Sequence, residues 1–113
     1  MRSAVVGAAL LLSVPSQAAQ PRIASMNVCT DQLLLSLADP GQIVGLSRYA
    51  RDDWQSWRAA EARKFPVLSG GAEDILVLKP DVVVASLFDK RATRELLRAN
   101  SVRLAEFSVP RTM

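Results

Sequence analysis

The feature that most constrains the fold is residues 66–86, where a glycine turn, a helix pattern, a helix stop and an apolar run follow one another closely. The paired glycines allow a sharp bend of the backbone, and residues 72–78 are long enough for a short helix. A lysine-proline pair then ends the helix, because proline pushes the preceding residue out of the right-handed helical region. Residues 82–85 show no polar alternation, which is typical of a strand that helices cover on both faces of a parallel sheet.

Strand and helix patterns alternate along the chain from residue 22 onward. The expected strands are residues 22–26, 42–46, 65–68, 82–85 and 102–107, and the expected helices are residues 29–38, 54–63, 72–78 and 90–99. Strands that alternate with helices of this length form parallel sheets with right-handed crossovers. The sequence therefore predicts an α/β fold, a Rossmann-like three-layer lobe with a mostly parallel sheet of about four to five strands.

Apolar residues recur at helical spacing in three of these helices and predict which faces are buried. They are Leu33, Leu34 and Leu37; Trp54, Trp57 and Ala60; and Ala92, Leu96 and Ala99. We expect the two tryptophans to cover an edge of the sheet, and Arg91, Glu95 and Arg98 of the last helix to face water.

The first residues have the pattern of an export signal rather than of a folded element. Arg2 gives a positive start, residues 4–14 are largely apolar, and small residues follow at 16–19. An apolar run of this length is too short to span a bilayer. We therefore expect residues 1–19 to be a signal peptide, residues 20–113 to be the folded domain, and the protein to work in the periplasm.

The composition argues against several classes of function. The chain has no histidine, which removes the usual general base and the commonest zinc ligand, so a hydrolase or metalloenzyme is not expected. Its formal net charge of +3 is scattered among acids rather than gathered in a stripe, which argues against nucleic acid as a partner. The single cysteine, Cys29, cannot form an internal disulfide. The sequence thus predicts no enzyme and no cofactor or metal of its own.

Four motifs occur in the same order as in one family of transport proteins. They are residues 22–27, 29–35, 39–47 and 70–81, with the sequences RIASMN, CTDQLLL, DPGQIVGLS and GGAEDILVLKPD. The chain resembles the N-terminal lobe of the periplasmic substrate-binding proteins that serve iron-chelate and cobalamin ABC importers. Because that family has a second lobe, the resemblance implies that residues 20–113 are a truncated N-terminal lobe from which the second lobe is absent.

Parallel α/β sheets bind ligands just beyond the carboxyl ends of their strands. In this sequence that rule selects the loops 27–29, 47–49, 69–71, 86–89 and 109–111. From these loops we expect the ligand-binding residues Asn27, Arg48, Tyr49, Gly70, Phe88 and Arg111. The arginines and the tyrosine suit a bulky, anionic chelate, because they offer fixed positive charge and an aromatic face. The alternative for each is an ordinary solvated loop position, and Asp89 is expected to cap the following helix.

Glu73 lies in the first turn of the expected helix at residues 72–78, where the helix dipole alone favours a carboxylate. In the family that the chain resembles, an acid at this position on each lobe meets arginines of the membrane permease. The resemblance therefore implies that Glu73 is a permease-docking residue, with the neighbouring Asp74 as the alternative contact.

The resemblance implies a function in binding and handover rather than in bond chemistry. The expected protein is the solute-binding component of an ABC importer for a metal chelate, which is an iron-siderophore, haem or cobalamin. Its partners would be that metal-chelate or corrinoid ligand and the inner-membrane ABC permease. The alternative is a small exported protein-interaction module without a transport role. A nucleotide-binding Rossmann domain is disfavoured, because the loop after the first strand, residues 26–29, contains no glycine.

Overall fold

The computed structural model describes residues 3–5, 7 and 19–108, so most of the expected signal peptide and the expected site residue Arg111 lie outside the described residues. Within them, five strands form one sheet in the order β3-β2-β1-β4-β5, and every neighbouring pair is parallel. The strands are β1 (Ile23–Ser25), β2 (Ile43–Ser47), β3 (Val67–Leu68), β4 (Val82–Ser86) and β5 (Arg103–Phe107). The expected α/β lobe with a parallel sheet is confirmed.

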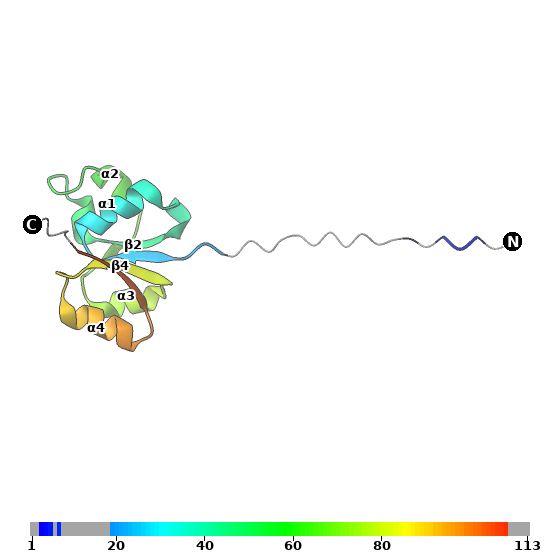
Figure 1. Cartoon of the computed structure of the whole chain (residues 1–113). Helices are drawn as coiled ribbons and strands as arrows, with labels where there is room; N and C mark the ends of the chain where they lie inside the picture. Colours follow the sequence, from blue (N-terminus) through cyan, green and yellow to red (C-terminus); the bar gives the residue numbers. More distant parts are fainter. Residues whose placement is uncertain (1–2, 6, 8–18, 109–113) are drawn as a thin grey trace, which may run out of the picture.

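Helices lie on both faces of the sheet and make three layers (Figure 1). They are α1 (Val28–Leu37), α2 (Ala59–Ala62), α3 (Ala72–Leu78) and α4 (Arg91–Ala99), with short 3-10 helices η1 (Pro40–Gln42) and η2 (Arg48–Arg51). Figure 1 shows α1 and α2 on one side of the sheet and α3 and α4 on the other. None of the helices in the described part of the chain is long and apolar enough to cross a membrane.

Local sequence explains where two of the helices begin and end. Asn27 caps α1, because its side-chain oxygen accepts a hydrogen bond from the Thr30 amide at 2.9 Å, and the Asn27 amide in turn donates to the Thr30 hydroxyl. α3 ends at Lys79, which adopts a left-handed conformation with a φ of 48° immediately before Pro80. The expected helix stop at this lysine-proline pair is confirmed.

Two apolar clusters, one on each face of the sheet, form the core. The cluster beside α3 and α4 contains Ala24, Leu68, Ala72, Ile75, Val83 and Leu97, and the cluster beside α1 and α2 contains Leu34, Leu35, Ile43, Leu46, Ala50 and Ala62. β4 is not covered equally by the two layers, because Val83 and Ala85 are fully buried whereas Val82 and Val84 are only half-buried. Helices therefore lie on both faces of β4, as expected, but they cover the side of Val82 and Val84 less completely.

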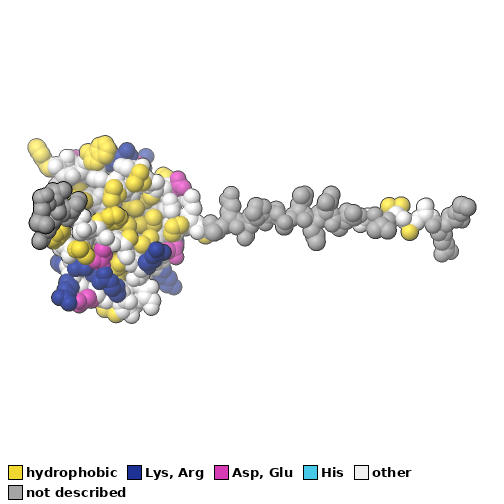
Figure 2. Space-filling model, in the orientation of Figure 1, with side chains coloured by type: hydrophobic (Ala, Val, Ile, Leu, Met, Phe, Trp, Pro, Cys, Tyr) yellow, Lys and Arg dark blue, Asp and Glu magenta, His cyan; other side chains and the backbone are white. Residues whose placement is uncertain are grey.

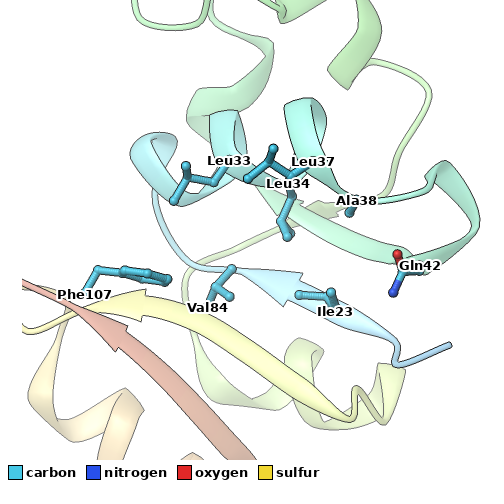
Figure 3. Close-up of a pocket in the computed structure, with 8 residues that line it drawn as sticks. All are labelled: Ile23, Leu33, Leu34, Leu37, Ala38, Gln42, Val84 and Phe107. Atoms are coloured by element: carbon cyan, nitrogen blue, oxygen red, sulfur yellow. The ribbon is translucent and has the colours of Figure 1, made fainter.

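The uncovered apolar surface lies between α1 and β5, and we call it the open groove. Figure 2 shows hydrophobic side chains gathered on this face, and Figure 3 shows leucines of α1 above Val84 and Phe107 of the strands. Of the expected apolar face of α1 only Leu34 is buried, whereas Leu33 and Leu37 are 43% and 81% exposed and line the groove. The groove holds a cavity of about 380 Å³ and is lined by Ile23, Leu33, Leu34, Leu37, Ala38, Gln42, Val84 and Phe107.

The buried face of α4 is displaced by one position from the expected one. Thr93 and Leu97 are buried, whereas the expected Ala92, Leu96 and Ala99 are exposed. Residues four positions apart share one face of a helix, so burial of the leucine at 97 brings residue 93 with it. The alanines fitted the helical period but supply little apolar area to bury.

The helix expected at residues 54–63 is shortened to α2. Asp52 holds the preceding chain in a turn, because its carboxylate accepts hydrogen bonds from the amide of Trp54 and the side chain of Gln55, each at 2.8 Å. Such local bonds between side chain and backbone compete with helix formation. Trp54 and Trp57 are 98% and 75% exposed, so the expectation that they cover an edge of the sheet is wrong.

Candidate functional site

The carboxyl ends of the five parallel strands lie at one edge of the sheet, where α/β folds bind ligands. We call this edge the rim and define it as residues 26–27, 47–51, 69–71, 86–90 and 107–108. A cavity of about 160 Å³, the rim cavity, is lined by Met26, Ser47, Arg48, Tyr49, Ser69, Gly70, Asp89 and Lys90. The structure therefore brings together three of the predicted site residues, Arg48, Tyr49 and Gly70.

The turn after β2 presents a cation and an aromatic ring as a unit. The Arg48 guanidinium donates a hydrogen bond from Nη2 to the Tyr49 hydroxyl at 2.8 Å, and its Cζ lies 4.9 Å from the centre of the tyrosine ring. Both side chains are exposed at the surface. Because each side chain holds the other in place, a ligand that bound here would meet them already arranged, and less side-chain freedom would be lost on binding.

The turn after β3 is held in place by its own backbone and by a carboxylate from α3. Gly70 has a φ of 99°, a conformation that side chains other than glycine rarely adopt, and no protein atom occupies the space where a Cβ would stand. The Ser69 amide donates to Oδ2 of Asp74 at 2.5 Å, which fixes the turn on α3. Gly70 therefore contributes an opening in the cavity wall rather than a side chain.

Two other predicted residues, Asn27 and Phe88, lie beside a different hollow. This cavity of about 490 Å³ meets the open groove, with which it shares Leu33 and Phe107. Phe88 is 79% exposed, so its ring is accessible from solvent. The rim thus holds a polar cavity between the loops after β2, β3 and β4 and a more apolar hollow between the loops after β1, β4 and β5.

The side chain of Asn27 is engaged within the protein. Its Oδ1 caps α1, and its Nδ2 donates to Oδ2 of Asp89 at 2.8 Å. Asp89 Oδ2 also accepts from the Ser86 amide at 2.8 Å, and the N-cap position of α4 belongs to Lys90. The expectation that Asp89 caps the following helix is therefore wrong, because its carboxylate turns back to join the loops after β1 and β4.

Lys90 is a residue of the rim cavity that sequence reasoning missed. The helical pattern of residues 90–99 placed it inside a helix, whereas α4 begins one residue later and leaves Lys90 exposed in the preceding loop. Its position directly after the loop 86–89 was the available signal. Together with Arg48, it gives the cavity two cationic side chains, which the carboxylate of Asp89 partly balances.

The structure separates the roles of the two acids at the start of α3. Glu73 is exposed, and Asp74 is half-buried and occupied by the Ser69 amide. A residue that already holds a loop is poorly suited to contact a partner, so Glu73 is the better candidate for docking. Among the described residues, no group of three or more His, Cys, Asp or Glu side chains is placed to hold a metal ion.

Solved structures with the same fold are periplasmic ligand-binding proteins. The chain is similar to the periplasmic haem-binding protein RhuT from Roseiflexus sp. RS-1, with a TM-score of 0.61 and 23% identity over 78% of this chain and 34% of that one. It is also similar to a periplasmic haem-binding protein from Pseudomonas aeruginosa, with a TM-score of 0.64 and 17% identity over 78% and 31% of the two chains. A third similar structure is the periplasmic vitamin B12-binding protein BtuF of Vibrio cholerae, with a TM-score of 0.60 and 21% identity over 79% and 34%.

These matches confirm the expected resemblance at the level of the fold. The chain spans about one third of the length of each of these proteins, since the covered shares of their chains are 34%, 31% and 34%. No protein-family model and no curated protein sequence matches the chain.

Proposed function

We propose that the chain is the N-terminal, ligand-receiving lobe of a periplasmic solute-binding protein, which captures a metal chelate and hands it to an inner-membrane ABC permease. The ligand is haem, a cobalamin or an iron-siderophore. Residues 1–19 direct export, and residues 20–113 form the lobe. Its work is binding and handover, and no covalent bond is made or broken.

The observation that carries this proposal is the composition of the rim cavity. Arg48 and Tyr49 reach it from the loop after β2, Gly70 from the loop after β3, and Lys90 from the loop after β4. Haem and cobalamin are broad macrocycles, and haem bears carboxylates, so an aromatic face beside two cations matches their chemistry. The similar solved structures, which are named for binding haem and vitamin B12, support the same ligand class.

The remaining predicted residues have different parts in the proposal. Phe88 offers a second aromatic surface, and Asn27 acts by holding the Asp89 loop in place. Arg111 is proposed as a further cation only from its position in the sequence after β5.

Ligand titration of the purified chain tests the proposal. Residues 20–113 are titrated with haemin, cyanocobalamin, ferrichrome and ferric citrate, and the fluorescence of Trp54 and Trp57 is followed. We expect one ligand to bind with a Kd no tighter than about 1 µM, equivalent to about 8 kcal/mol, because one lobe contacts one side of the ligand. Arg48→Ala and Tyr49→Ala should each weaken this binding at least fivefold, whereas Val77→Ser, at a 79% exposed position of α3 outside the rim, should not.

Three outcomes would count against the proposal. Failure of all four ligands to bind would contradict the function, and equal affinities of Arg48→Ala and the unchanged chain would contradict the site. Submicromolar binding would show that a second lobe is unnecessary for capture.

Permease docking by Glu73 is the second part of the proposal. An exposed ion pair is worth about 0–1 kcal/mol, so the loss of one glutamate should slow association and reduce affinity by less than tenfold. We expect Glu73→Lys to weaken binding of the chain to nanodiscs that carry a haem or vitamin B12 permease. The matched control is Glu95→Lys, an exposed acid on α4. Equal effects of the two substitutions would show a general charge effect and contradict docking at Glu73.

A further inference from the structure

A buried carboxylate lies directly behind the rim. Asp31 of α1 is 0% exposed and accepts two hydrogen bonds from Ser47, one from the amide at 3.0 Å and one from the hydroxyl at 2.5 Å. None of the salt bridges within residues 19–108 includes it. Burial raises the pKa of Asp31 above the ordinary 3.8, and the hydrogen bonds from Ser47 oppose that rise. A buried carboxylate without a cation is costly, so packing alone does not account for its position.

The partner of Asp31 is the residue that joins β2 to the candidate site. Ser47 is the last residue of β2 and the N-cap residue of η2, and it is 5% exposed. The next two residues, Arg48 and Tyr49, carry the cation and the ring of the rim cavity. Because Asp31 holds both the amide and the hydroxyl of Ser47, it fixes the point at which the strand ends and the direction in which the turn departs.

The first turn of α1, which contains Asp31, also holds the loop after β4, the strand that pairs with β1 on the side away from β2. Asn27, the N-cap residue of α1, binds the Asp89 carboxylate, which in turn accepts from the Ser86 amide at the end of β4. The start of α1 therefore connects the loops after β1, β2 and β4. Met26, Ser47 and Asp89, one residue from each of these loops, line the rim cavity.

We propose that Asp31 is a positioning residue of the ligand site, which sets the placement of Arg48 and Tyr49 through Ser47 without touching the ligand. This inference rests on the proposed function. The carboxylate geometry is suited to the task, since two acceptor oxygens engage two donors of a single residue. A buried apolar side chain at position 31 would fill the space but leave the Ser47 amide and hydroxyl without these acceptors.

The test compares Asp31→Ala with Asp31→Asn in the purified chain 20–113. Asparagine can accept a hydrogen bond from the Ser47 amide and donate one to the Ser47 hydroxyl. We therefore expect Asp31→Asn to bind haemin or cyanocobalamin, whichever the unchanged chain binds more tightly, with an affinity within twofold of that of the unchanged chain. Alanine should weaken that affinity at least fivefold and speed amide hydrogen exchange at Arg48 and Tyr49. Leu97→Ala supplies a control chain that is destabilised on the opposite face of the sheet. Under conditions where this variant is fully folded, its affinity for the same ligand should stay within twofold of that of the unchanged chain.

The two readouts separate this inference from the proposed function. If no ligand binds the unchanged chain, the proposed function fails, while hydrogen exchange still shows whether position 31 holds the turn. Unchanged exchange and affinity in Asp31→Ala would overturn the inference, and so would an equal loss of affinity in Leu97→Ala. If Asp31→Ala does not fold, Ser47→Ala removes only the hydroxyl contact and should show the same two changes at a smaller size. Its failure to change either readout would also overturn the inference.

Discussion

The two faces of the sheet differ in how completely helices cover them and in the partners that each provides for an acid shielded from solvent. On the closed face, α3 and α4 bury Leu97 fully, and Glu106 of β5 lies between Arg94 and Arg98 of α4. On the opposite face, α1 leaves the open groove uncovered, and its buried acid, Asp31, accepts hydrogen bonds from the hydroxyl and the amide of Ser47 instead of pairing with a cation. Both faces bury an apolar cluster, so the difference lies in the groove that α1 leaves open and in the partners of the two acids.

The largest expected effect is a cavity in the closed face. Leu97→Ala should lower the free energy of unfolding by about 2–5 kcal/mol, because the residue is 0% exposed and belongs to the apolar core cluster on this face of the sheet. Leu37→Ala, at an 81% exposed position on the other face, should change it by less than about 0.5 kcal/mol. Urea denaturation followed by circular dichroism measures both. Similar losses in the two variants would remove the distinction between the faces.

Removal of the acid from the closed face should have the next largest effect. The carboxylate of Glu106 pairs with Arg94 at 3.0 Å, and these side chains are only 12% and 11% exposed. Glu106→Ala would leave the Arg94 charge buried, and we expect a loss of about 3 kcal/mol in the free energy of unfolding. The exposed pair of Arg91 and Glu95, at 2.6 Å, is the control, and Glu95→Ala should cost about 0.3–0.5 kcal/mol. Equal costs in urea denaturation would show that burial does not strengthen the Glu106 pair.

The acid of the α1 face should give a smaller effect with a definite dependence on pH. Burial raises the pKa of Asp31 in the folded protein above the ordinary 3.8, and the negative charge of Asp89 adds to the rise. At a pH between the pKa of Asp31 in the unfolded chain and its higher pKa in the folded chain, the folded state binds more protons than the unfolded state. The contribution of Asp31 to stability is therefore full below pH 3.8 and falls as the pH rises through the folded pKa.

Asp31→Asn should remove this dependence. The free energy of unfolding of each chain is measured in urea from pH 3.5 to about pH 8. Relative to Asp31→Asn, the unchanged chain should be most stable at low pH, and this advantage should shrink as the pH rises. Parallel curves, or an advantage of the aspartate that grows with pH, would show that burial does not dominate at this position.

The contrast between the faces also explains what the sequence could predict. The order of strands and helices, the parallel sheet and the rim all follow from local signals, such as the glycine turn and the lysine-proline stop before β4. The buried side of α4 depends on which side chains fill the core, and a leucine at 97 outweighed the better periodicity of the neighbouring alanines. Coverage of β4 depends on how far α1 reaches across the sheet, which no single segment encodes.

The candidate site shows the same limit. Arg48, Tyr49 and Gly70 could be predicted because a parallel sheet brings the ends of its strands to one edge. Lys90 was missed because α4 begins one residue later than its sequence pattern indicates. The hydrogen bond between Asn27 and Asp89 joins residues far apart in the sequence, so no local pattern shows that Asp89 does not cap the helix. The same reason hid Asp31, whose partner lies sixteen positions away in the sequence.

The smallest expected change in stability belongs to the open groove itself. Phe107 is 50% exposed and lines the groove on the side of β5, so Phe107→Ser should alter the free energy of unfolding by no more than about 0.5 kcal/mol. It should nevertheless reduce aggregation at high concentration, because exposed apolar patches promote association. We expect the unchanged chain and the variant to sediment as monomers when dilute. A stable dimer that Phe107→Ser dissociates would instead favour an exported protein-interaction module over a chelate-binding lobe, and would show that the open face is a functional surface in its own right.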